Sequence, residues 1–283
     1  LKKEGYHTSF FHGSFNGSQN FDQFSKIAGF QEYYGKNEYP DKNPEHYDGK
    51  WGVFDEEFLN FYGKKLNTFH EPFFSSIFTI SSHIPFIMPN KHKGKFKKGA
   101  TLFQETVGYT DYSLKKFFEY AKIQKWYKNT LFVITADHCS SIKKGFYKSI
   151  IQEYSIPFIF FDPSNNDLKG VSLKNFQQID ILPSVLDYLN YNKKYISYGN
   201  SFKTKSNFIV NYINNSFHIA TDDYYFIFDG IKIVELYNFK TDENLKNNLI
   251  LVNKKLVSNL ETKAKAYLQS FNNNLINNKL TVQ

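Results

Sequence analysis

One segment decides the predicted fold, Asn129-Thr130-Leu131-Phe132-Val133-Ile134-Thr135-Ala136-Asp137-His138. Its apolar centre is nearly continuous, which is typical of a strand buried on both faces of a parallel sheet. A carboxylate and an imidazole follow this strand directly, and ligand sites in open α/β sheets gather at the carboxyl ends of strands. Oxygen and nitrogen donors of this kind suit a divalent metal. Asp137 and His138 are therefore candidate metal ligands, although a polar turn with a capping Asp would have the same sequence.

Strand and helix patterns alternate on both sides of this segment. Short β-rich or continuously apolar runs predict strands, and apolar residues at helical spacing predict helices. The alternation indicates an α/β fold, a three-layer sandwich around a mostly parallel sheet. The further predicted strands cover residues 6–11, 72–80 and 156–161, and the predicted helices cover residues 21–28, 55–66, 101–124 and 180–189.

The predicted secondary structure changes after residue 206. Four short β-rich runs separated by turn residues predict an antiparallel meander, and a long final stretch predicts a terminal helix. We therefore expect two parts, with residues 1–206 as the sandwich domain and residues 207–283 as a small α+β appendage. The four runs cover residues 208–213, 217–221, 224–228 and 231–236, and the helix covers residues 256–278.

The first five residues have the pattern of a helix end. Leu1-Lys2-Lys3-Glu4-Gly5 reads as the last turn of a helix with a Gly stop. One turn cannot nucleate a helix alone. We expect that the domain begins upstream of Leu1 and that this sequence is its later part. The isolated chain should then expose apolar sheet surface and aggregate or remain loosely packed.

The positive charge of the chain comes from lysine alone. All 35 basic residues are Lys, against 27 acidic residues, so the formal net charge is +8. One explanation is an A/T-rich genome, and the other is attraction to an anionic surface or polymer. Specific nucleic-acid recognition is not expected, because arginine is the usual bidentate reader of phosphate and guanine. The lysine-rich run at residues 91–98 is either a solvated loop or a contact with lipid headgroups or an anionic polymer.

The cysteine count and the hydropathy pattern exclude two kinds of protein module. A single Cys excludes an internal disulfide framework and a Cys-based zinc site. No stretch reaches the roughly 18 apolar residues that would span a bilayer. The two tryptophans, Trp51 and Trp126, are expected to pack against the protein rather than to stack on a ligand.

Two further histidines follow predicted strands, as His138 does. His12 ends the strand at residues 6–11, and His83 comes just after the strand at residues 72–80. If the strands are parallel, the three imidazoles share one edge of the sheet and form one site. Imidazoles around a metal suit the stabilisation of charge on a transferring phosphoryl group. The alternative for each histidine alone is a surface or loop residue without a role in chemistry.

Several short segments occur in an order that carries a family resemblance. They are Gly5-Tyr6-His7-Thr8, His12-Gly13, Gly29-Phe30, Trp51-Gly52-Val53-Phe54-Asp55, Ser82-His83-Ile84-Pro85-Phe86, Tyr109-Thr110-Asp111, the quoted segment up to His138, Gln178-Ile179-Asp180-Ile181-Leu182-Pro183-Ser184 and Leu236-Tyr237-Asn238-Phe239-Lys240-Thr241-Asp242. Together they resemble the lipoteichoic acid synthase-like, or phosphoglycerol transferase, branch of the sulfatase and alkaline phosphatase superfamily.

The resemblance implies a fold, a reaction and a set of residue roles. It implies an alkaline phosphatase-like sandwich and the metal-dependent transfer of phosphoglycerol from a phospholipid headgroup to a cell-envelope acceptor, an anionic polymer or a glycan. Asp137 and His138 match the metal-ligand pair, for manganese or magnesium. His12 and His83 match histidines that bind the substrate phosphate. The family nucleophile is a threonine, which would precede Leu1, as would a further metal carboxylate.

The resemblance also implies a location, and it leaves two alternatives open. Members of this branch are anchored in the cell membrane by helices that this chain does not contain, with the catalytic domain on the extracytoplasmic side. The first alternative is a sulfatase or phosphodiesterase of the same superfamily, although the sulfatase segment Cys/Ser-x-Pro-x-Arg does not occur here. The second is a non-catalytic domain that binds an envelope polymer and lacks the nucleophile.

Overall fold

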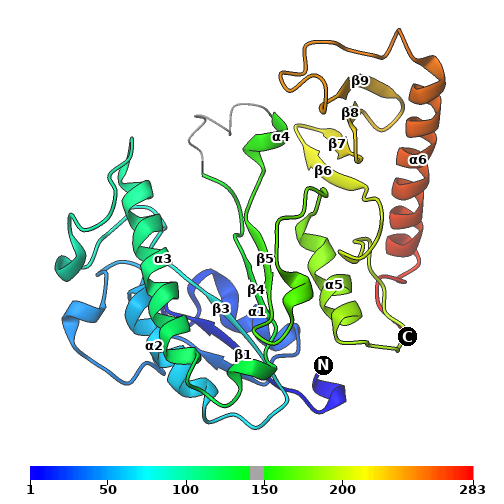
Figure 1. Cartoon of the computed structure of the whole chain (residues 1–283). Helices are drawn as coiled ribbons and strands as arrows, with labels where there is room; N and C mark the ends of the chain where they lie inside the picture. Colours follow the sequence, from blue (N-terminus) through cyan, green and yellow to red (C-terminus); the bar gives the residue numbers. More distant parts are fainter. Residues whose placement is uncertain (141–149, 283) are drawn as a thin grey trace. The chain divides into compact units, whose positions relative to one another are not determined.

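A computed structural model describes residues 1–140 and 150–282 of the chain (Figure 1). The chain divides into two compact units. The first unit comprises Leu1–Phe132 and Phe160–Leu168, and the second comprises Val133–Ile159 and Lys169–Gln283. The predicted domain boundary after residue 206 stays a prediction.

A parallel sheet forms the centre of the first unit. Strand β1 (His7–His12) lies between β2 (Glu32–Tyr34) and β3 (Phe73–Phe78), and both neighbours run parallel to it. The register pairs His12 with Phe78, so β1 and β3 reach the same edge of the sheet. Strands β1 and β3 confirm the sequence prediction, whereas the three-residue strand β2 was not predicted.

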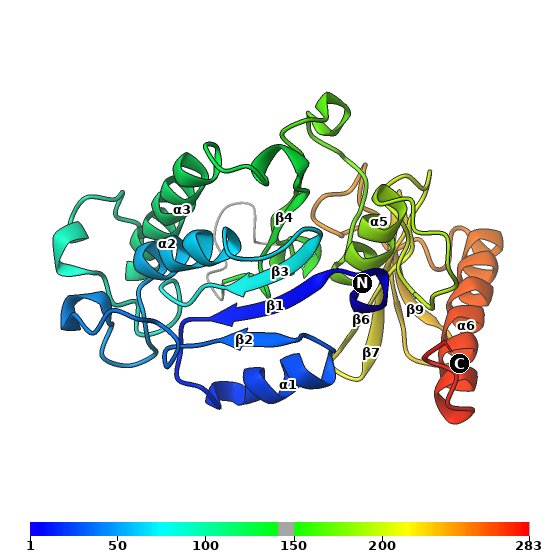
Figure 2. The ribbon, with the colours of Figure 1, turned by 90° about the horizontal axis from the view of Figure 1, so that it is seen from below.

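Helices cover both faces of this sheet (Figure 2). Side chains of a strand alternate between its faces, and β1 shows this directly. Phe10 stacks on Phe21 of α1 (Phe21–Ile27), with ring centroids 5.9 Å apart. Phe11 packs on the opposite face against Tyr62 of α2 (Asp55–Leu66), at 4.8 Å. Helix α3 (Leu102–Ala121) packs beside α2, and the α/β sandwich predicted from the sequence is confirmed.

The second unit contains the predicted meander and terminal helix. Four antiparallel strands follow one another in the sheet, and α6 (Lys254–Ile276) packs on one of its faces. Leu260 and Ala264 of α6 share a core with Ile219, Phe226 and Leu236. The strands are β6 (Ile209–Ile213), β7 (Ser216–Ala220), β8 (Tyr224–Phe228) and β9 (Ile233–Asn238).

The segment that decided the predicted fold forms strand β4 (Phe132–Thr135), which pairs with β5 (Phe158–Phe161). Both strands were predicted, but the prediction that β4 is buried on both faces is wrong, because its first three residues are only partly buried and Thr135 is exposed. Ile159 of β5 is likewise 47% exposed. Within the described residues these two strands form a sheet of two. In the chain, the short helix α4 (Ile150–Glu153) comes between these two strands, and α5 (Ile181–Tyr188) follows them.

The described helices give one further result. None of them is both long and apolar enough to cross a bilayer.

Candidate functional site

His12 ends strand β1 as a buried imidazole. The residue is only 3% exposed, and its ring lies 4.4 Å from that of Phe21 and 5.6 Å from that of Phe78. Burial lowers the pKa of His12 to about 4, so the ring is neutral at physiological pH. Its Nδ1 atom has no hydrogen-bond partner within the described part of the chain. A buried imidazole with an unused polar atom is a candidate for ligand binding.

The neutral state of His12 predicts a pH-dependent stability. Between about pH 6.5 and pH 4 the unfolded chain binds a proton at this site that the folded chain does not. The free energy of unfolding should therefore fall by up to about 3 kcal/mol as the pH is lowered through this range. Denaturant titrations at several pH values measure it, and His12→Gln should remove this part of the dependence. A His12→Gln protein with the pH dependence of the wild type would contradict the assignment.

His83 lies beyond the carboxyl end of β3, on an exposed loop. Its backbone N–H donates to the carbonyl of Ile80 at 3.1 Å. Its Nδ1 lies 2.9 Å from the carbonyl oxygen of Ile84, which can only accept, so Nδ1 carries a proton and Nε2 faces away from this bond. The imidazole ring lies beside the indole ring of Trp51, with centroids 4.5 Å apart and the two planes at 67° to each other. His83 is thus an accessible imidazole with one nitrogen already oriented.

The segment of residues 51–55 supports the chain just after His12. The Val53 N–H donates to the carbonyl of Gly13 at 2.9 Å, and the Ser14 hydroxyl donates to the carbonyl of Trp51 at 2.6 Å. The backbones approach so closely that a Cβ atom on Gly52 would lie 2.1 Å from the Gly13 carbonyl oxygen. Only glycine fits at this position.

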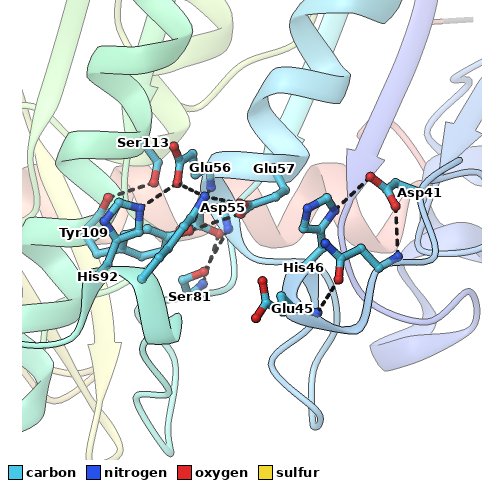
Figure 3. Close-up of polar contacts among 12 residues, drawn as sticks. Asp41, Glu45, His46, Asp55, Glu56, Glu57, Ser81, His92, Tyr109 and Ser113 are labelled. Atoms are coloured by element: carbon cyan, nitrogen blue, oxygen red, sulfur yellow. Dashed lines mark hydrogen bonds and ion pairs between the residues drawn. The ribbon is translucent and has the colours of Figure 1, made fainter.

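The same segment supports the loop of His83 through Asp55. One carboxylate oxygen of this fully buried residue accepts the N–H groups of Ile80 at 2.9 Å and Ser81 at 3.1 Å, and the other accepts the Thr110 hydroxyl at 2.8 Å. The Asp55 N–H in turn donates to the Ser81 hydroxyl (Figure 3). Burial raises the pKa of Asp55, while these hydrogen bonds act in the opposite direction. Asp55 therefore fixes the start of the loop that carries His83.

Asp137 and His138 lie in the second unit, just after β4. His138 Nε2 is 3.3 Å from Asp137 Oδ2, and both side chains are more than half exposed. His138 Nδ1 lies 2.7 Å from the carbonyl oxygen of Cys139. A carbonyl contact of this kind keeps the proton on Nδ1 and leaves Nε2 free to bind a metal.

The donor atoms of Asp137 and His138 are of chemical types that bind a divalent ion. A carboxylate oxygen and an imidazole nitrogen 3.3 Å apart are ligand types that suit manganese or magnesium. The pair alone does not complete a site, because residues 1–140 and 150–282 contain no group of three or more His, Cys, Asp or Glu suited to one ion. Asp137 and His138 would therefore supply part of the coordination.

A second supporting segment, residues 177–180, positions Asp137. The Gln178 side-chain amide donates to the carbonyls of Ala136 at 3.0 Å and Asp137 at 2.8 Å. Fully buried Asp180 accepts the N–H of Gln177 at 2.9 Å. Asp180 also accepts the N–H of Asn200 at 2.7 Å and the side-chain amide of Asn207 at 2.6 Å. The residues that follow β4 are thus tied to a rigid turn.

The four predicted site residues therefore divide between the units. His12 and His83 lie in the first unit and are linked through residues 51–55, whereas Asp137 and His138 lie in the second. The shared edge expected for all four stays a prediction. Asp55 and Gln178 were not identified as supporting residues from the sequence, although both lie in segments that carried the family resemblance.

The lysine-rich run at residues 91–98 has a structural role at its beginning. Lys91 Nζ lies 2.7 Å from a Glu56 oxygen and 2.6 Å from a Glu57 oxygen. His92 is buried and its Nε2 lies 2.7 Å from Glu56 (Figure 3). These contacts hold the loop against the first turn of α2. The description of the run as a solvated loop is therefore wrong for His92, which is buried, whereas the Lys91 side chain remains 53% exposed. The sequence does not show which acidic side chains will meet these two residues.

Comparisons with known proteins were made by family, by sequence and by structure. The sulfatase family model matches residues 1–191. Lipoteichoic acid synthase 1 of Bacillus subtilis is 27% identical over 267 residues, which cover 87% of this chain and 40% of that protein. The lipoteichoic acid synthase of Staphylococcus aureus is 25% identical over 268 residues, covering 88% of this chain and 39% of that protein. The chain thus spans about 40% of the length of these curated relatives.

Solved structures share the fold. A protein of the alkaline phosphatase superfamily from Vibrio parahaemolyticus has a TM-score of 0.76 at 22% identity, and the match covers all of this chain and 68% of that one. The lipoteichoic acid synthase LtaP from Listeria monocytogenes has a TM-score of 0.75 at 20% identity, covering 97% of this chain and 72% of that one. The chain belongs to the sulfatase family, in the lipoteichoic acid synthase-like branch of the alkaline phosphatase superfamily.

Proposed function

We propose that this chain is part of a metal-dependent phosphotransferase that moves phosphoglycerol from a phospholipid headgroup to a cell-envelope acceptor. The observation that carries the proposal is the pair Asp137 and His138, in which the carbonyl of Cys139 orients the imidazole and leaves Nε2 beside a carboxylate oxygen. The similarity to lipoteichoic acid synthases supports phosphoglycerol as the transferred group.

Asp137 and His138 would hold manganese or magnesium together with ligands that precede Leu1. When bound, the ion supplies positive charge that stabilises the phosphoryl oxygens during transfer. Asp137 contributes a carboxylate, and His138 contributes the nitrogen that its contact with Cys139 leaves open. Gln178 holds the backbone of Ala136 and Asp137 at the end of β4 through hydrogen bonds to their carbonyl oxygens.

His12 and His83 would bind the oxygens of the substrate phosphate. His83 donates Nδ1–H to the Ile84 carbonyl, so its protonated form has one further donor, Nε2–H, together with a positive charge. His12 stays neutral and offers a buried polar atom without charge. Donors held in place before the reaction stabilise the charge that develops on a phosphoryl group.

The transfer would take place in two steps, through a covalent intermediate. A threonine that precedes Leu1 attacks phosphorus, and the bond to the lipid breaks as the Thr–O–P bond forms, with the proton passing to the departing diacylglycerol. A hydroxyl of the acceptor then attacks the same phosphorus and restores the threonine. The acceptor would be an anionic envelope polymer or a glycan, at the extracytoplasmic side of the cell membrane.

A sulfatase, which hydrolyses sulfate esters, is the second candidate, because the matching family model is that of sulfatases. Release of diacylglycerol from phosphatidylglycerol, compared with release of sulfate from an aryl sulfate, distinguishes the two. The proposed function predicts manganese-dependent release of diacylglycerol that a chelator abolishes. Release of sulfate without turnover of the lipid would contradict it.

Replacement of His83 tests the proposed phosphate contact. In the full-length protein, which includes the residues proposed to precede Leu1, we expect His83→Ala to lower turnover of a phosphatidylglycerol analogue by about 10²–10³, the usual effect of removing one donor that acts on the transition state. His83→Asn should be impaired as well, because Asn can keep a hydrogen bond to the loop but carries no positive charge. Metal content and the melting temperature serve as controls. Near-normal turnover in both variants would remove His83 from the site.

A further inference from the structure

Trp51 is held firmly beside His83. Its backbone N–H donates to the Asp48 carboxylate at 2.7 Å, and its carbonyl accepts the Ser14 hydroxyl at 2.6 Å. The indole N–H donates to the carbonyl of Ile84 at 2.7 Å. The ring therefore has a fixed orientation, which it keeps without a ligand.

The remaining surface of the indole is apolar and partly accessible. Its one polar atom is bonded to Ile84, and the residue is half-buried, while the adjacent His83 and Ile84 are exposed. Trp126 differs, since it is 4% exposed and lies in the aromatic core with its N–H on Asn67. The expectation that both tryptophans only pack therefore holds for Trp126 but leaves the Trp51 surface unexplained.

We propose that Trp51 determines substrate specificity by binding the carbon skeleton of a phosphorylated polyol whose phosphate lies on His83. This inference rests on the proposed function of His83. The two rings have centroids 4.5 Å apart, so the carbons of an ester whose phosphate is hydrogen-bonded to His83 come within reach of the indole. Rigid aromatic rings bind such carbons with little loss of conformational entropy. Inorganic phosphate has no carbon to place there.

Binding measurements with two probes test the role of Trp51. The probes are glycerol phosphate and inorganic phosphate, titrated calorimetrically in the presence of manganese into the full-length protein, which includes the residues proposed to precede Leu1. We expect the wild type to bind glycerol phosphate at least about tenfold more tightly, the range of selectivity that an apolar contact provides. Trp51→Leu should bind the two anions equally, and Trp51→Phe should keep part of the preference.

The Phe variant separates a ligand contact from a merely structural role. Trp51→Phe and Trp51→Leu both lose the hydrogen bond to Ile84, so a structural role predicts equal effects in both. Fluorescence gives a second measurement, because binding of glycerol phosphate to the wild type should alter the fluorescence of Trp51. Trp126→Phe serves as the matched control for this signal. That signal should disappear in Trp51→Phe and persist in Trp126→Phe.

Three results would overturn the proposal. A preference for glycerol phosphate that survives in Trp51→Leu would exclude the contact with Trp51, as would equal loss of preference in Trp51→Phe and Trp51→Leu. If diacylglycerol is still released from phosphatidylglycerol in those cases, the proposed function stands and only the role of Trp51 fails. If the wild type binds neither anion and releases no diacylglycerol, both fail together.

Discussion

Replacing Asp137 with alanine is expected to abolish manganese binding and to lower metal-dependent turnover by a factor of at least about 10³. Even the loss of a group that only supports a metal ligand lowers metal affinity or activity by about 10–100-fold. The physical reason is that the carboxylate supplies both a ligand atom and a negative charge that partly neutralises the positive charge of the ion. His138 would remain oriented by the Cys139 carbonyl but would lack its partner 3.3 Å away. Calorimetric titration with Mn²⁺ measures binding, and release of diacylglycerol measures turnover.

The matched control for this variant is Asp167→Ala. Asp167 is also an exposed aspartate, in a short helical turn that contains no proposed site residue. Its replacement should leave both manganese binding and turnover unchanged. Unchanged manganese affinity in Asp137→Ala would remove Asp137 from the metal site.

Replacing Asp55 with alanine is expected to lower the free energy of unfolding by about 3–5 kcal/mol. The N–H groups of Ile80 and Ser81 and the hydroxyl of Thr110 would lose their shared acceptor in a fully buried place. Each buried polar group left without a partner costs about 1–3 kcal/mol. Denaturant titration measures the effect.

Two milder substitutions show whether the Asp55 carboxylate acts through these bonds. Thr110→Val removes only one of them and should cost about 1 kcal/mol. Asp55→Asn keeps an acceptor for the two backbone groups and should lie between Thr110→Val and Asp55→Ala. If Asp55→Ala is no less stable than Thr110→Val, the carboxylate does not hold the His83 loop.

The local parts of the fold follow from local patterns in the sequence. Helix α2 runs from Asp55 to Leu66, the same residues that its apolar spacing predicts. Strands β1, β3 and β4 also form where continuous apolar or β-rich runs predict them. The predicted placing of His12 at the end of β1, of His83 on the loop that follows β3 and of Asp137 just after β4 is therefore correct, because a strand end is a property of a few neighbouring residues.

The parts that the sequence did not reveal depend on contacts between distant residues. Asp55 binds backbone groups 25 and 26 residues away, and Gln178 binds carbonyls 41 and 42 residues away. No periodicity in the sequence reports such partners. Strand β2 was missed for a related reason, since its three residues are too few to show an alternating pattern and it is defined by pairing with β1.

The fate of a labelled headgroup shows whether the protein transfers phosphoglycerol. The protein would be incubated with Mn²⁺, a glycolipid acceptor and phosphatidylglycerol labelled in the headgroup glycerol. We expect the label to move to the acceptor as a phosphoglycerol ester, with one diacylglycerol released for each transfer, and we expect a chelator to stop both. Recovery of the label only as free glycerol phosphate would contradict transfer, because it would show that the lipid is hydrolysed. Cleavage of an aryl sulfate by a protein that does not turn over the lipid would also contradict transfer.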